Sequence, residues 1–189
     1  MSAHPDANSY TAAIRDQVVA ALGARHEVDL LDLYAEGFVP ELSARAHELH
    51  TAEPSTKPEI ANEVERLLAA RMLVLVYPTW WGSQPAILKG WFDRIWTTGV
   101  AYDLVPDKAL LQGRLSNIRR LVVVTTHGSP KWVNALEGEP GKRLVLRGLR
   151  TLCHRWCRTK WLAFYGLDRA GDVERRSFLD RVDRYFARV

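Results

Sequence analysis

The chain of 189 residues has the length of one α/β domain and contains enough sequence to bury a substantial core. Its composition, 47% hydrophobic and 25% charged residues, is ordinary for a globular protein. No apolar run approaches the length of a membrane-spanning helix, and no charged-then-apolar N-terminus indicates a signal peptide. We therefore expect a cytoplasmic protein without membrane insertion.

The net charge of +4 is unevenly distributed along the chain. Residues 1–141 hold 13 basic and 17 acidic side chains, whereas residues 142–189 hold 13 basic and 5 acidic ones. A basic end can attract nucleic acid or phosphorylated ligands. Because no nucleic-acid motif accompanies the charge, we interpret it as the solvated faces of surface helices and predict no nucleic-acid partner.

The first element is unusually short. A doubly wound domain should open on an apolar strand, but here only residues 1–3 precede a loop at His4. Asn8 or Ser9 then caps a helix that ends at Gly23. Either the sequence is clipped upstream, which we favour, or the sheet has a gap that leaves two neighbouring strands unpaired.

The loop before this helix carries groups that suit a phosphate. Asn8, Ser9 and Thr11 offer amide and hydroxyl groups, and the helix start offers backbone N–H groups. Plain helix capping by Asn8 and Ser9 is compatible with this interpretation. The chain contains neither GxxxxGK[ST] nor GxGxxG, so a separate nicotinamide nucleotide site has no support.

Helices and strands are predicted to alternate along the rest of the chain. Short, mainly apolar runs predict strands at residues 73–77, 121–126 and 161–165, and a further strand is predicted at residues 27–33, EVDLLDL. Helices are predicted near 43–50, from Pro58, over 86–98, across 145–156 and from Asp172. This alternation predicts an α/β fold with a parallel sheet. Cys153 and Cys157, one turn apart on the predicted helix, are poorly placed for a disulfide and are expected to be buried thiols.

The stretch from residue 73 to 99 organises these elements. An apolar strand leads into a loop with Trp80 and Trp81, and the helix that follows carries Gly90 on its polar half. In a doubly wound sheet the ligand lies beyond the carboxyl ends of the strands. Two adjacent tryptophans there suit a flat aromatic ligand, although they can also plug the end of a core.

Residues 78–94, PTWWGSQPAILKGWFDR, resemble the signature of the flavodoxin-like NAD(P)H:quinone oxidoreductases, the group of DT-diaphorase and the modulators of drug activity. The segments Val100–Tyr102 and Thr125–Gly128 are similar to two further motifs of that family. The resemblance implies one flavodoxin-like domain over residues 1–189, with five parallel strands in the order 2-1-3-4-5 and a truncated first strand.

The resemblance also implies the site residues. Flavin-binding positions would be His4, Asn8, Ser9, Tyr10, Thr11, Pro78, Thr79, Trp80, Trp81, Gly82, Thr125, Thr126, His127 and Gly128. Tyr102 would contact the quinone, although a purely structural Tyr102 stays open. Independently of the resemblance, His127 is a candidate proton donor to a bound quinone, because the ordinary pKa of histidine lies in a useful range. His127 stands where the family has glycine, which would cost energy if that position needs a positive φ.

The implied activity is a flavin-dependent, ping-pong NAD(P)H:quinone oxidoreduction. FMN is the expected cofactor, with FAD as the alternative, and NADPH or NADH and a quinone-like acceptor would use one pocket in turn. The resemblance further implies a homodimer, and Gly90 would permit close approach of the second chain. The alternative function is a flavin-binding ancillary or regulatory subunit of a potassium-efflux system, which would keep the same loops.

Overall fold

A computed structural model describes residues 1–48, 58–105 and 110–189. Its central sheet has three parallel strands in the order β1 (Met72–Pro78), β4 (Arg120–His127) and β5 (Arg158–Tyr165). The three corresponding apolar runs of the sequence are therefore confirmed as strands. Each strand extends slightly beyond its predicted range, because neighbouring strands of a parallel sheet satisfy one another's backbone groups.

Residues 1–3 continue the sheet beside β1. Parallel backbone bridges join Ser2 to Val76 on one side and to Asp32 on the other. The spatial order is thus residues 31–33, residues 1–3, β1, β4 and β5, which is the predicted order 2-1-3-4-5. The predicted strand over 27–33 is wrong in extent: only Asp32 is bridged, because residues 1–3 are too short to reach residues 27–30.

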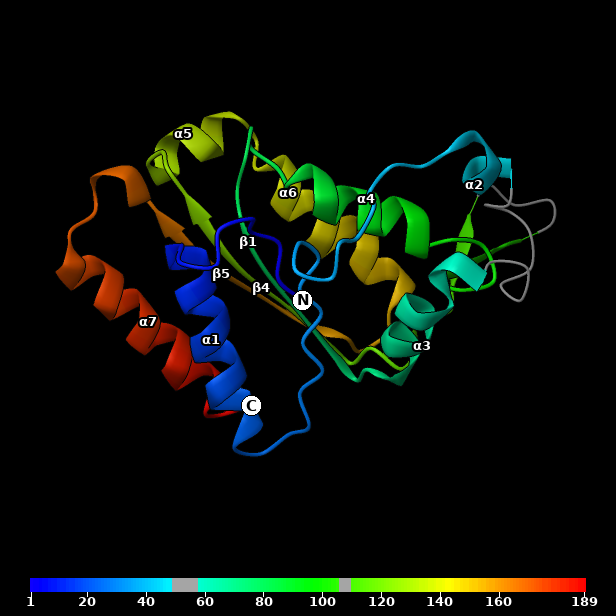
Figure 1. Cartoon of the computed structure of the whole chain (residues 1–189), viewed down its shortest axis with the longest axis horizontal. Helices are drawn as coiled ribbons and strands as arrows, with labels where there is room; N and C mark the ends of the chain where they lie inside the picture. Colours follow the sequence, from blue (N-terminus) through cyan, green and yellow to red (C-terminus); the bar gives the residue numbers. More distant parts are fainter. Residues whose placement is uncertain (49–57, 106–109) are drawn as a thin grey trace.

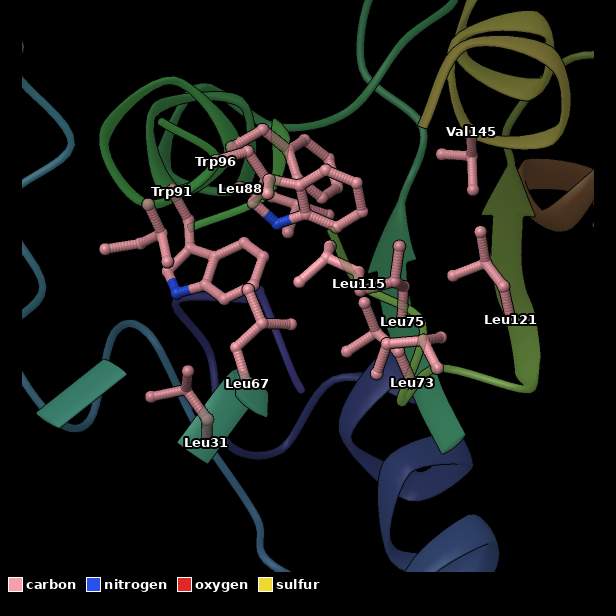
Figure 2. Packing of buried hydrophobic residues seen from close by; sticks show 14 of the residues in the cluster. Leu31, Leu67, Leu73, Leu75, Leu88, Trp91, Trp96, Leu115, Leu121 and Val145 are labelled. Atoms are coloured by element: carbon pink, nitrogen blue, oxygen red, sulfur yellow. The ribbon is translucent and has the colours of Figure 1, made fainter. Parts of the chain in front are cut away.

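Helices cover both faces of the sheet, as a doubly wound fold requires. α1 (Tyr10–Gly23) and α7 (Asp172–Phe186) cover one face, and α3 (Ala61–Ala69) and α4 (Ala86–Ile95) cover the other (Figure 1). Alternate side chains of β4 point to opposite faces of the sheet. Val122 and Val124 pack with α1 and α7, whereas Leu121 and Val123 belong to the hydrophobic cluster under α3 and α4. Figure 2 shows the latter cluster, in which Trp91 of α4 lies beside the sheet residues.

Shorter elements complete the described part of the chain. They are α2 (Ala44–Glu48), η2 (Pro58–Ile60), the antiparallel pair β2 (Tyr102–Leu104) and β3 (Leu111–Gly113), α5 (Lys131–Leu136), α6 (Pro140–Arg143), the π-helical η3 (Leu144–Gly148), and the 3-10 turns η4 (Leu149–Leu152) and η5 (Leu167–Arg169). The predicted helix at 43–50 is present as α2, with residues 49 and 50 outside the described ranges. Within those ranges, no helix has both the length and the apolarity needed to cross a membrane.

The helix predicted across 145–156 is shorter than expected. Its last turn ends at Leu152, and Cys153 takes an extended backbone conformation. Trp156, the last residue of the predicted range, lies outside the helix and is exposed to solvent. The placement of both cysteines on one helix is therefore wrong, although both are free, buried thiols as expected. Helix α4 also ends three residues early, because Trp96 leaves the helical conformation at ψ 63°.

Gly90 does not face a second chain. It is buried, and a Cβ at this position would overlap the backbone of Pro40 in the same protein. Arg94, one turn later, holds the same segment: it donates to the Val39 carbonyl and lies over the ring of Phe38. The expectation that Gly90 admits a partner chain is wrong, because residues 38–40 already fill that space.

Gly90→Ala should lower the free energy of unfolding by about 1–3 kcal/mol, since a methyl group overlapping fixed backbone atoms forces the segment apart. Gly23→Ala is the matched control: no atom lies within 4 Å of its added Cβ, so alanine should be neutral or stabilising in α1. Chemical denaturation of both variants measures the difference. Equal stabilities would show that residues 38–40 do not pack on α4 as described.

Candidate functional site

Three loops meet at the carboxyl edge of the sheet. They are residues 4–9 after the first strand segment, residues 79–85 after β1 and residues 128–130 after β4. The rings of His4 and Trp80 lie 6.2 Å apart, and the Thr79 N–H donates to the Thr126 carbonyl at 2.7 Å. Thr11 Oγ1 and Thr126 Oγ1 lie 3.5 Å apart. The structure therefore brings three predicted segments together at the edge where doubly wound sheets bind ligands.

The first loop presents the N-terminus of α1. Ser9 is the N-cap, and its hydroxyl accepts from the Ala12 N–H at 3.1 Å, so the predicted capping is confirmed for Ser9. Among the described residues, none accepts from the backbone N–H of Tyr10 or Thr11. These two donors lie at the positive end of a 14-residue helix, an arrangement that suits a phosphate group.

The side chain of Tyr10 points away from the helix N-terminus. The Tyr10 hydroxyl donates to the Arg175 carbonyl at 2.6 Å, and its ring packs on Phe164. Burial raises the pKa of Tyr10 to about 12, so the phenol stays neutral. His4 Nδ1 accepts from the Asp6 N–H at 3.0 Å and so shapes the loop. Asn8 is exposed on the same loop. The backbone of Tyr10, rather than its side chain, is thus available to an anion.

The loop after β1 is a tight turn with two tryptophans. Trp80 and Ser83 exchange backbone hydrogen bonds at 3.1 Å, and both central residues have positive φ, 49° at Trp81 and 72° at Gly82. This is the geometry of a type I′ turn, in which tryptophan at the first central position is strained. Trp81 is fully exposed to solvent, and Trp80 is 42% exposed.

A buried glutamine anchors this turn to the following part of the chain. Gln84 donates to the Gly141 carbonyl at 2.8 Å and to the Tyr77 hydroxyl at 3.2 Å, and it accepts from the Ser83 hydroxyl at 2.8 Å. Burial and these bonds fix the base of the turn below the tryptophans. Nothing in the sequence pattern indicates this role, because Gly141 is 57 positions away.

His127 ends β4 and takes no positive φ, so the substitution for glycine causes no backbone strain. Its Nδ1 lies 2.6 Å from Asn134 Oδ1. The Asn134 amide group donates to Ser129 and Pro130, so its oxygen is the acceptor that faces the histidine. His127 is therefore assigned as the Nδ1–H tautomer, and its Nε2 is an acceptor 3.4 Å from Thr79 Oγ1.

The ring of His127 stacks on Tyr165, with 4.5 Å between ring centroids. The Tyr165 hydroxyl donates to Glu139 Oε1 at 2.9 Å, and Lys142 pairs with the other carboxylate oxygen at 2.7 Å. Burial lowers the pKa of His127 and raises that of Tyr165 to about 12. Both rings are thus neutral near pH 7. Asn134, Glu139 and Tyr165 were missed by sequence analysis, since contacts between separate elements leave no local pattern.

The remaining predicted residues fall into two groups. Pro78 ends β1, Thr125 and Thr126 are buried near the end of β4, and Gly128 follows directly after it. Tyr102, in contrast, lies on β2 beyond the C-terminal end of α4, whereas the tryptophan turn precedes the N-terminal end of that helix (Figure 1). One chain therefore does not bring Tyr102 to the other candidate residues.

A family model described as the flavodoxin-like fold matches residues 1–188. The chain belongs to the flavodoxin-like family. Rat NAD(P)H dehydrogenase [quinone] 1 is 31% identical over 163 residues, which cover 76% of this chain and 58% of that protein. Escherichia coli "Uncharacterized NAD(P)H oxidoreductase YcaK" is 37% identical over 102 residues, which cover 53% of this chain and 52% of that protein. The chain thus spans about half the length of these curated relatives.

Solved flavodoxin-like structures agree with the fold. Smu.1420 from Streptococcus mutans is 28% identical, with a TM-score of 0.86 over all of both chains. NAD(P)H:quinone oxidoreductase from Methanothermobacter marburgensis is 27% identical, with a TM-score of 0.79 over 98% of this chain and 92% of that one. The expected resemblance of this chain to the quinone oxidoreductase group is therefore confirmed. In the described ranges no group of three or more His, Cys, Asp or Glu is placed to hold a metal ion.

The neutral His127 makes the stability of this flavodoxin-like domain depend on pH. The pKa of His127 in the folded protein lies below 6.5, the ordinary value for histidine. As the pH falls below 6.5, His127 therefore becomes protonated in the unfolded chain before it does so in the folded protein, which favours unfolding. The wild-type protein should lose stability between pH 7.5 and 5.5, and His127→Gln should lose less. Urea denaturation at both pH values measures the difference. An equal loss in both proteins, or an Nε2–H tautomer in long-range ¹H–¹⁵N spectra, would contradict the assignment.

Proposed function

We propose that this protein is a flavin-dependent NAD(P)H:quinone oxidoreductase. The observation that carries the proposal is the Trp80–Trp81 turn, which holds two exposed indoles beside the free N–H groups of the α1 N-terminus. A ligand with an aromatic ring system and a phosphate would suit this site, because the ring can stack on the indoles and the phosphate can accept from the N–H groups. The naming of relatives as NAD(P)H dehydrogenases and oxidoreductases supports the same activity.

FMN is the flavin that we propose, with FAD as the alternative. The backbone N–H groups of Tyr10 and Thr11, together with Ser9, would hold its phosphate. The turn at 79–82 and the end of β4 at 125–128 would border its ring. When bound, the flavin would accept a hydride from NADPH or NADH and pass two electrons to a quinone-like acceptor.

The residues around the ring position shape the site rather than react. The Thr79 hydroxyl lies 2.9 Å from Thr125 Oγ1 and 3.4 Å from the acceptor Nε2 of His127. These two neighbours fix the orientation of the hydroxyl. The only N–H of neutral His127 is engaged with Asn134. We therefore propose His127 as a positioning residue for Thr79, in place of the proton donor that the ordinary pKa of histidine suggested. The indole of Trp81 would cover the ring and exclude water from the acceptor.

The proposal predicts that the protein retains FMN. After incubation with FMN and desalting, the wild-type protein should show flavin absorbance that bleaches with NAD(P)H under anaerobic conditions and returns on addition of a quinone. Trp81→Asn should keep its stability, because asparagine tolerates the positive φ of this turn. Its kcat/KM for the quinone should fall about tenfold, as for a loss of about 1.4 kcal/mol of transition-state stabilisation.

Trp156→Asn is the matched control, since Trp156 is also an exposed tryptophan but lies before β5, at the opposite end of the sheet. It should bind FMN and turn over quinone like the wild type. A correctly folded wild-type protein that retains no flavin would contradict the proposed function. Equal losses in the two tryptophan variants would show that the turn has no special role.

We also propose a homodimer that covers the site. Trp132 and Leu136 of α5 are 70% and 84% exposed, and Glu137 at the end of that helix lies beside Gly82 of the tryptophan turn. A second copy would bury these apolar groups, and only from such a copy would Tyr102 reach the pocket. Sedimentation at micromolar concentration tests this, and a monomer with bound flavin would refute it.

We place the reaction in the cytoplasm, because the NAD(P)H donor and two free thiols fit a reducing compartment. Cell fractionation tests this location. No contact of the described residues favours the alternative function, an ancillary subunit of a potassium-efflux system.

A further inference from the structure

A row of arginines lies at the amino ends of the three central strands, opposite the end that carries the candidate ligand site (Figure 1). Arg71 directly precedes β1, Arg119 and Arg120 stand at the start of β4, and Arg158 begins β5. The Arg119 N–H donates to the Arg71 carbonyl at 2.8 Å, and the Arg158 N–H donates to the Arg119 carbonyl at 3.0 Å. These backbone bonds fix the four residues side by side.

The positive charges of this row lie close together without counter-ions. Arg120 and Arg158 are direct partners in the parallel register of β4 and β5, and neighbouring strands lie about 4.8 Å apart. Among the described residues, no carboxylate forms an ion pair with Arg71, Arg119, Arg120 or Arg158. Guanidinium groups are always charged, so at this spacing they repel one another. An anion that bound across the row would offset this repulsion.

An exposed tryptophan lies next to this row. The turn before β5 contains Arg155 and Trp156, and the Cys157 N–H closes it by donating to the His154 carbonyl at 2.7 Å. Trp156 is 71% exposed, and the Arg155 guanidinium lies 5.3 Å from the centroid of its ring. The Arg155 carbonyl accepts from the Arg150 side chain at 2.7 Å, which holds the turn in place. A flat aromatic ring is thus presented beside the cations.

The chemistry of this surface suits phosphate groups and nucleobases. We call it the arginine face, and its members are Arg71, Arg119, Arg120, Arg155, Trp156 and Arg158. All of its cations are arginines, whose planar guanidinium groups can bind two phosphate oxygens at once. Across three strands the row spans about 10 Å, which leaves room for more than one phosphate. An exposed indole can stack on any nucleobase.

Carboxylates at the same end of the molecule limit the shape of a partner. Glu27 and Asp29 lie before residues 31–33, at the edge of the sheet opposite to β5, and Glu63 lies on α3. Of these three, Asp29 is neutralised by an ion pair with Arg66. A flat anionic membrane that touched the arginine face would also approach Glu27 and Glu63. A single strand of nucleic acid is narrow enough to follow the starts of β4 and β5 and to avoid them.

We propose that the arginine face binds single-stranded nucleic acid, with phosphates on the arginines at the starts of β4 and β5 and a base stacked on Trp156. The expectation of no nucleic-acid partner rested on charge spread over the solvated faces of helices. Every member of the arginine face lies outside the helices instead. This inference does not depend on the proposed flavin chemistry, because the two sites lie at opposite ends of the sheet and no readout needs flavin.

The test measures the fluorescence anisotropy of a labelled oligothymidylate of about 15 nucleotides. The wild-type protein should bind it with a Kd of about 10 µM or tighter at about 50 mM salt, and the affinity should fall as salt is added. Arg119→Gln/Arg158→Gln should weaken binding at least about tenfold and lower the slope of log K against log salt by about 1.4, the value for two lost phosphate contacts. Both side chains are exposed, so the unfolding midpoint should not change.

Two further variants separate position and stacking from net charge. Arg169→Gln/Arg176→Gln is the matched control, since it removes two exposed arginines that follow β5 at the opposite end of the sheet. It should bind like the wild type. Trp156→Asn should weaken binding at least about fivefold through the lost stacking, with an unchanged salt slope, because no phosphate contact is removed.

Three results would overturn the proposal. The first is equal weakening by the two arginine pairs, which would reduce the binding to a response to net charge. The second is wild-type affinity in Trp156→Asn, which would assign the face to anions without bases. The third is a wild-type protein that does not bind the oligonucleotide; if it then sediments with vesicles of anionic phospholipid, the face belongs to a lipid surface. Selective loss in Arg119→Gln/Arg158→Gln and in Trp156→Asn supports the proposal.

Discussion

The burial of β4 on both faces is the constraint on which the rest of the structure depends. Its apolar residues from Leu121 to Val124 are completely inaccessible to solvent, and a strand in that position needs a strand on each edge and helices on each face. β1 and β5 supply the edges, and the α1–α7 and α3–α4 pairs supply the faces. All connections then emerge at the two ends of the sheet, which is why the candidate site lies at one of them.

The polar end of β4 follows from the same burial. Thr125, Thr126 and His127 remain buried after the apolar run, so each needs a hydrogen-bond partner from a neighbouring element. Thr79 satisfies Thr125, Thr11 lies within reach of Thr126, and Asn134 accepts from His127. Satisfying these groups ties the loops after two strands and the start of α1 into one unit. The strained Trp81 turn is held on this unit, at a cost of order 1–3 kcal/mol, without helping to stabilise it.

The sequence predicted those features whose cause is local. Residues 73–77 and 121–124 are apolar because both faces of these strands are covered, and Ser9 caps its helix by accepting from an N–H only three residues away. Features that need a distant partner were missed or mistaken. Residues 27–30 alternate acidic and apolar side chains, as a strand can, but they lack a neighbour to pair with. Gly90 lies on the polar half of α4, yet Pro40 covers it. The roles of Asn134 and Tyr165 depend on contacts between separate elements, which periodicity does not encode.

Residues 1–3 link the sheet to the candidate ligand site. Their backbone pairs with β1 and with residues 31–33, and the next residue, His4, opens the loop that presents the α1 N-terminus. Only single bridges hold this segment, so its position depends on few hydrogen bonds. The contact between the rings of His4 and Trp80 therefore depends on how residues 1–3 pair with β1 and with residues 31–33. In this way the pairing of three residues in the sheet positions one side of the candidate ligand site.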